Sequence, residues 1–146
     1  MAAMVLVPDA SVLLQWILRS DDEADCDRAL ELKTAWLDDA CDLVVPSLWV
    51  FEVGNVLGRK YPATAASLLQ ALIDLGIREE APHGDIAAIV SLMRDHKVTF
   101  YDAAYHALAI RHGGTMLTAD GAYVKKAARA GHVTLLNDWR APAAGV

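Results

Sequence analysis

Short apolar runs that alternate with helical patterns constrain the fold of this chain more than any other feature of its sequence. The runs have the length of buried strands and lie at residues 4–7, 43–45, 115–118 and 133–136, and residues 77–79 are a candidate for one further strand, the third along the chain. The stretches between them space their apolar residues as amphipathic helices do. Strands and helices in alternation are typical of a parallel sheet with helices on both faces. We therefore predict one α/β domain over residues 1–146, with a frayed small-residue tail at 140–146.

The ends of several helices carry their own sequence signals. Thr99 stands three residues before Asp102, as in a capping box, and Gly113 and Gly114 end the helix that follows. Two further helices are expected to open at Ser47 and Pro62 and to cover residues 48–60 and 62–75. The capping box places Asp102 in the first turn of its helix.

Four acidic residues stand close to the predicted ends of strands or on apolar helices. Asp9 follows the first expected strand, Asp120 follows the fourth, Asp102 opens a helix, and Glu52 lies inside the helix over 48–60. In open parallel sheets, the ligand crevice lies beyond the carboxyl ends of the strands, where such residues can meet. Each aspartate could instead serve only as a helix cap, and Glu52 could belong to an exposed polar stripe. The sequence leaves both interpretations open.

If the four carboxylates share one crevice, they repel one another unless a cation neutralises them. Mg²⁺ and Mn²⁺ prefer oxygen ligands and are the natural occupants of such a site. A zinc site is not favoured, because the chain has no HExxH motif and no thiol near these acids. The conjunction of four acids therefore predicts a Mg²⁺ or Mn²⁺ centre.

The charge distribution bears on the partners of the chain. A net charge of −6 argues against a general nucleic-acid binder, yet residues 97–146 hold six Lys and Arg against three Asp and Glu. Three of these bases follow Asp120, and they indicate either an RNA-binding surface or a solvated helix face: Lys125, Lys126 and Arg129.

Two other features concern the environment of the chain. Cys26 and Cys41 form no CxxC motif, and together with the lack of a signal peptide or membrane span they favour the reducing cytoplasm. The apolar content of 55% is high for a small domain and indicates surface that a partner chain covers. Gly54 and Gly58, four residues apart, would admit a close helix, either from a second subunit or from the same chain.

Four segments carry a resemblance to a known family: VPDASVLLQW, PSLWVFEVGNVL, TFYDAAYHALA and LTADGAYVKKA. They resemble the four acidic motifs of the PIN-domain family, and most of all its VapC-type toxin branch. The resemblance implies a five-stranded parallel sheet of order 3-2-1-4-5 with helices on both faces. It also implies a homodimer and inhibition by a small antitoxin protein whose tail covers helices beside the cleft. The site that it implies is a metal-dependent ribonuclease centre made by Asp9, Glu52, Asp102 and Asp120, with Ser11 and Thr118 as neighbouring hydroxyls.

On this basis we expect a hydrolase that acts as the RNA-cleaving toxin of a type II toxin–antitoxin pair. Asp9 and Asp102 would hold the metal, Asp120 and Glu52 would complete its shell, and one of these last two would orient the attacking water. His106 is expected to be structural. The rival interpretations are an inactive PIN-like binding module, a housekeeping PIN nuclease without an antitoxin, and a phosphatase with an aspartyl nucleophile. The phosphatase would prefer a second acid where Ser11 stands.

Overall fold

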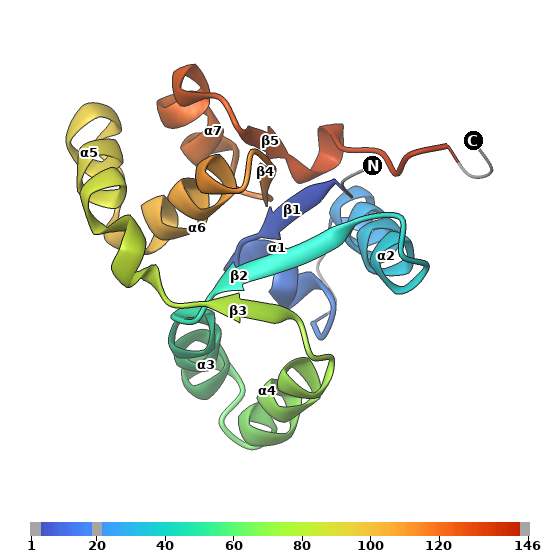
Figure 1. The fold of residues 1–146 in the computed structure, drawn as a ribbon. Helices are drawn as coiled ribbons and strands as arrows, with labels where there is room; N and C mark the ends of the chain where they lie inside the picture. Colours follow the sequence, from blue (N-terminus) through green and yellow to red (C-terminus); the bar gives the residue numbers. More distant parts are fainter. Residues whose placement is uncertain (1–3, 19–21, 144–146) are drawn as a thin grey trace.

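A five-stranded, all-parallel sheet forms the centre of the protein (Figure 1). The computed structural model describes residues 4–18 and 22–143. The strand order is β3-β2-β1-β4-β5, which confirms the expected α/β fold and its order. The strands are β1 (Val5–Pro8), β2 (Asp42–Pro46), β3 (Arg78–Glu80), β4 (Thr115–Thr118) and β5 (Val133–Leu135).

Helices cover both faces of this sheet (Figure 1). Successive residues of the central strands point to opposite faces, so Leu6 and Leu117 join one apolar core while Val7 and Met116 join the other. The first core packs against α2, and the second packs against α3, α5, α6 and α7. The helices are α1 (Ala10–Gln15), α2 (Glu23–Leu37), α3 (Trp49–Lys60), α4 (Ala65–Asp74), α5 (Ile86–His96), α6 (Phe100–Arg111) and α7 (Gly121–Ala127).

The helix that carries Asp102 begins and ends as its sequence predicts. The hydroxyl of Thr99 accepts the backbone N–H of Asp102 at 3.2 Å, so Thr99 caps α6. Gly113 follows the last turn with φ +63°, a left-handed conformation that glycine adopts without strain. Gly114 then passes so close to β1 that a Cβ there would lie 2.3 Å from the carbonyl oxygen of Val5. Only glycine permits this approach between the start of β4 and β1.

Two expected helix starts are wrong. Ser47 does not cap α3: its N–H donates to the carbonyl of Glu80, and the helix begins after Leu48 with no side-chain cap. Pro62 does not open α4, because Thr64 N–H closes a turn onto the carbonyl of Tyr61 and the helix begins at Ala65. In both places a turn precedes the helix, at residues 47–48 and 62–64. The helix therefore begins one or more residues after the expected start.

The crossing of α3 and α4 accounts for Gly54. A Cβ at Gly54 would lie 3.3 Å from Leu69 Cδ2 of α4, whereas one at Gly58 would meet nothing within 4 Å. The intramolecular alternative therefore explains Gly54, and the Gly54/Gly58 pair no longer argues for a subunit contact.

At the C-terminal end, the N–H of Ala141 donates to Glu31 Oε1 of α2 at 3.0 Å, while residues 144–146 of the expected frayed tail lie outside the described part. Within residues 4–18 and 22–143, no helix is long and apolar enough to cross a membrane.

Candidate active site

The four predicted acids come from four elements that meet beyond the carboxyl ends of β1 and β4. Asp9 follows β1 and caps α1, Glu52 lies in the first turn of α3, Asp102 lies in the first turn of α6, and Asp120 caps α7 after β4. Their charges act on one another: Asp102 on both Asp9 and Glu52, Asp9 on Glu52, and Asp120 on Asp102. The fold thus gathers the acids that the sequence singled out.

Asp9 is the most enclosed of the four, with 5% of its surface exposed. Its Oδ1 accepts the hydroxyl of Ser11 at 2.5 Å and the N–H of Val12 at 3.2 Å. Burial raises the pKa of Asp9 to about 6 and the charge of Asp102 adds to the effect, while these hydrogen bonds and one from Thr118 oppose it. Asp9 therefore caps a helix and also belongs to the acid cluster, so the two interpretations of this residue do not exclude each other.

Ser11 and Thr118 join the ends of the two central strands. Ser11 Oγ accepts the N–H of Ala119 at 2.9 Å and lies 3.5 Å from Thr118 Oγ1. Thr118 is fully buried, and its Oγ1 accepts the N–H of Asp120 at 3.0 Å. The hydroxyls named from the sequence thus connect the backbone that carries Asp120 to the side chain of Asp9.

Glu52 lies among the acids and apart from the exposed polar face of α3. Asn55 and Arg59 are exposed, but Glu52 is half-buried and accepts a hydrogen bond from the Tyr105 hydroxyl at 3.4 Å. Burial raises the pKa of Glu52 to about 7, and the charges of Asp102 and Asp9 contribute to the increase. A carboxyl with this pKa changes its protonation state near neutral pH, whereas an ordinary exposed glutamate is already ionised there.

Asp102 and Asp120 form two walls of a pocket of about 260 Å³, together with Thr99, Tyr123 and Lys126. Burial raises the pKa of Asp102 and the charge of Asp120 adds to this, whereas the Thr99 hydroxyl and Lys126 lower it. Asp120 is exposed, and its Oδ1 accepts the N–H groups of Ala122 at 2.9 Å and Tyr123 at 3.3 Å. An acid cluster open to solvent on this side is accessible to a ligand.

A model of the PIN domain family matches residues 6–129 of the chain. The chain belongs to the PIN domain family. Comparison with curated protein sequences gives no match.

Solved structures with the same PIN fold come from several bacteria. VapC20 of Mycobacterium tuberculosis, described as a sarcin–ricin loop cleaving toxin, has a TM-score of 0.62 and 21% identity over 88% of this chain and 96% of that one. A toxin–antitoxin complex from Klebsiella pneumoniae has a TM-score of 0.63 and 16% identity over 95% and 99%. VapBC2 of Rickettsia felis, bound to a DNA fragment from its promoter, has a TM-score of 0.64 and 15% identity over 90% of this chain and 97% of that one. At these identities the likeness establishes the fold.

Some of the basic residues near the candidate site line its pocket, and others do not. Lys126 lines the pocket beside Asp102 and Asp120, whereas Lys125 and Arg129 are exposed on the same segment and do not line it. Lys97, which follows α5 with a left-handed backbone conformation (φ 56°), also lines the pocket. The sequence analysis missed Lys97, because nothing in its neighbourhood marks it.

Two buried tyrosines also escaped the sequence analysis. Tyr105 donates to Glu52, and Tyr123 lines the pocket. Each stands three residues after a site aspartate on the same helix, so spacing on a helix face was the signal that could have found them.

The residues of the PIN domain fit a hard divalent cation by charge and by donor type. Every candidate ligand is a carboxylate oxygen, and the acids raise one another's pKa, which a bound cation would reverse. Within the described ranges, no three carboxylate, imidazole or thiol side chains converge closely enough to hold an ion as they stand. Side-chain rotation would be needed to close a coordination shell around a metal.

Proposed function

We propose that this PIN domain is a Mg²⁺- or Mn²⁺-dependent endoribonuclease and the toxin of a type II toxin–antitoxin pair. The observation that carries the proposal is the electrostatic coupling of four carboxylates beyond the ends of β1 and β4, with the pKa of Asp9 at about 6 and that of Glu52 at about 7. Structural likeness to VapC20, described as a toxin that cleaves the sarcin–ricin loop, supports RNA as the substrate. Such a substrate, together with two cysteines in no disulfide framework, makes the cytoplasm the expected compartment.

Asp9 and Asp102 would hold the metal, with Glu52 and Asp120 completing its shell directly or through water. A metal bound there supplies Lewis-acid stabilisation of the phosphate and a water of lowered pKa. Ser11 and Thr118 fix the orientation of Asp9 through their hydroxyls. Glu52, which accepts the hydrogen bond of Tyr105, would orient the attacking water and take its proton, and Asp120 acting through a water is the alternative. Lys126 would face the RNA phosphate at the pocket, and Lys125 and Arg129 would contact phosphates further along the RNA chain.

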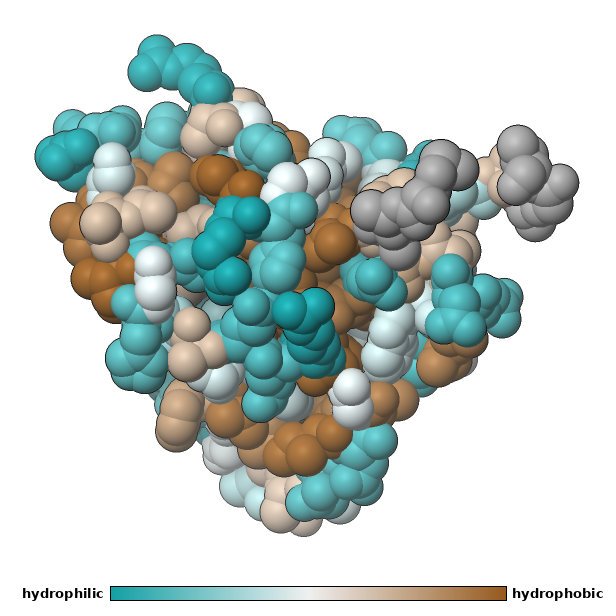
Figure 2. All heavy atoms as spheres, viewed as in Figure 1, coloured by the Kyte–Doolittle hydropathy of each residue, from teal (hydrophilic) through white to brown (hydrophobic). Residues whose placement is uncertain are grey.

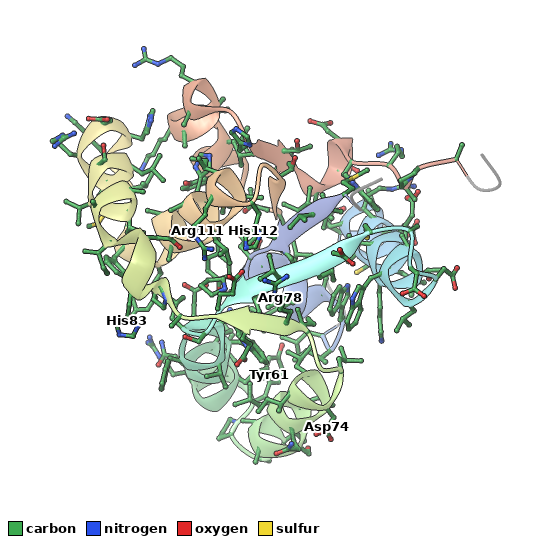
Figure 3. All side chains as sticks on the ribbon, viewed as in Figure 1. Tyr61, Asp74, Arg78, His83, Arg111 and His112 are labelled. Carbon is green, nitrogen blue, oxygen red and sulfur yellow. The ribbon has the colours of Figure 1, made fainter. Side chains whose placement is uncertain are left out.

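Cleavage of RNA by the purified full chain tests this proposal. We expect cleavage with Mg²⁺ or Mn²⁺ and none with EDTA, and we expect Asp102→Asn to lose orders of magnitude in rate. Asp74→Asn is the matched control, since Asp74 is an exposed acid on α4 (Figure 3). This variant should cleave RNA as fast as the wild type does. Equal cleavage by Asp102→Asn, or cleavage that persists in EDTA, would contradict the metal-dependent mechanism. A chain that binds an antitoxin but never cleaves RNA would be an inactive binding module.

Partner chains are proposed from the exposed apolar surface. Figure 2 shows hydrophobic residues gathered over α5 and over α3 and α4, where the large exposed side chains include Ile86, Val90 and Ile73. Phe51, next to Glu52 on α3, is 73% exposed. A homodimer and an antitoxin tail would each cover surface of this kind, and the Klebsiella pneumoniae and Rickettsia felis structures are toxin–antitoxin assemblies.

Two observations would test the proposed partners. Light scattering at micromolar concentration should show a dimer, and a persistent monomer would contradict the homodimer. A short adjacent reading frame that encodes a DNA-binding segment and a tail should yield a protein that co-purifies with the chain and stops cleavage. Cleavage that no such protein inhibits would favour the housekeeping nuclease.

A further inference from the structure

His106 is a polar residue with no exposed surface, and both of its ring nitrogens have partners. It lies on α6, one turn after Asp102. Nδ1 is 2.6 Å from the Tyr123 hydroxyl oxygen, and Nε2 is 2.6 Å from the carbonyl oxygen of Gly131. A carbonyl oxygen can only accept, so Nε2 carries the ring proton and Nδ1 accepts the proton of the tyrosine hydroxyl. Burial also lowers the pKa of His106, which keeps the ring neutral.

These two hydrogen bonds connect α6 with both ends of the segment that begins at α7. Tyr123 stands in the first turn of α7, three residues after Asp120, and Gly131 follows the short 3-10 turn Ala128–Ala130 that extends the helix. Asp102 in the first turn of α6 is therefore followed four residues later by His106, and Asp120 at the N-cap of α7 is followed three residues later by Tyr123. The tyrosine, 3% exposed, lines the same pocket as Asp102 and Asp120.

The two acids need such a restraint because they repel each other. The charge of Asp120 raises the pKa of Asp102, and the repulsion would fall if α6 and α7 moved apart. A metal ion bound by both acids requires the opposite, which is a fixed and short separation.

We propose that the His106–Tyr123 hydrogen bond positions Asp102 relative to Asp120 and thereby sets the affinity of the site for a divalent cation. The inference rests on the proposed function, since it assumes that these acids bind the metal. It makes His106 a positioning residue, which extends the structural role expected from the sequence. Partners that orient metal ligands typically change metal affinity by about 10-fold to about 100-fold when they are removed.

The variant Tyr123→Phe tests the proposal, because it deletes the hydroxyl and keeps the buried ring. Calorimetric titration of the full chain with Mn²⁺ alone should show an affinity that is lower by about 10-fold. Arg111→Gln is the matched control at the other end of α6 (Figure 3). It breaks the 2.8 Å bond from Arg111 Nε to the buried carboxylate of Asp85, so it should lower the melting temperature and leave the Mn²⁺ affinity unchanged.

Two further measurements separate positioning from general destabilisation. Nitrogen-15 shifts of the His106 ring should show the Nε2–H tautomer in the wild type and a change at Nδ1 in Tyr123→Phe. The double variant His106→Leu/Tyr123→Phe should lose no more Mn²⁺ affinity than His106→Leu alone, because both changes break the same bond.

Unchanged Mn²⁺ affinity in Tyr123→Phe, or an equal loss in Arg111→Gln, would overturn the positioning role while the proposed function stands. Absence of Mn²⁺ binding by the wild type would overturn the proposed function itself, and the positioning role with it. The wild-type titration alone therefore distinguishes the two failures.

Discussion

Replacing Asp9 by asparagine should stabilise the metal-free protein at neutral pH and leave its stability unchanged in acid. Asparagine caps a helix as well as aspartate does, so the N-cap of α1 is retained. Burial raises the pKa of Asp9 from 3.8 to about 6, which means that the folded state disfavours the ionised carboxylate. The stability that this group contributes is therefore complete below pH 3.8 and is lost as the pH rises through about 6.

The magnitude follows from the two pKa values. A carboxyl whose pKa rises from 3.8 to about 6 on folding costs the folded state about 3 kcal/mol once it is ionised. The neutral amide avoids this cost. For a chain of this size, 1 kcal/mol corresponds to roughly 3 °C in Tm, so the gain at about pH 7.5 approaches about 9 °C.

Thermal melts in EDTA at about pH 4 and about pH 7.5 measure the effect. Asp120→Asn is the matched control, because it makes the same change at the exposed cap of α7 and should alter Tm much less. Excess Mn²⁺ should stabilise the wild type more than Asp9→Asn, since a ligand stabilises only the folded form that binds it. If wild type and Asp9→Asn have the same Tm at both pH values, ionised Asp9 does not destabilise the folded state.

Three further tests each concern a different contact. Tyr105→Phe removes a hydrogen bond that lowers the pKa of Glu52, so the pH profile of RNA cleavage should move to higher pH; a fixed profile would exclude Glu52 as the base. Thr118→Val leaves the N–H of Asp120 without its buried acceptor and should cost about 1–3 kcal/mol in urea denaturation, with no loss if water replaces the hydroxyl. Gly114→Ala should lower Tm sharply, because its Cβ would lie 2.3 Å from the backbone of β1. Gly58→Ala, whose Cβ would meet nothing within 4 Å, should instead raise the free energy of unfolding by about 1 kcal/mol. Similar effects of the two substitutions would contradict the close approach of Gly114 to β1.

The sequence was sufficient for the fold wherever one local signal agreed with the tertiary packing. Thr99 and Gly113 mark both ends of α6 because a cap and a left-handed residue satisfy the helix termini whatever packs against the helix. Ser47 and Pro62 misled because their local preferences suit a turn as well as a helix start. At Ser47 the backbone N–H continues the pairing of β2 with β3 by donating to Glu80, and after Pro62 the bond from Thr64 N–H to the carbonyl of Tyr61 makes a turn.

The candidate site was predictable in its acids but not in their environment. Glu52 could be read as an exposed stripe residue, and only the position of α3 beside Asp9 and Asp102 makes it a half-buried carboxyl with a pKa of about 7. The partners Tyr105 and Tyr123 look like ordinary core aromatics in the sequence, because their function depends on which hydroxyl faces which acceptor. Such facing depends on how helices distant in the chain are packed together, which residue spacing alone does not encode.

The pairing of β1 with β4 determines when the site first exists during protein synthesis. The hydrogen bond from Ala119 N–H to Ser11 Oγ joins residues 108 positions apart. A ribosome therefore completes the segments that carry Asp9, Glu52 and Asp102 well before the chain supplies the strand that lies beside β1. Nascent or truncated chains that end before Thr115 contain three of the acids without the second wall of the crevice. If the chain is the nuclease proposed above, it acquires the complete site only after β4 has been made, so incomplete translation products would not cleave the RNA around them.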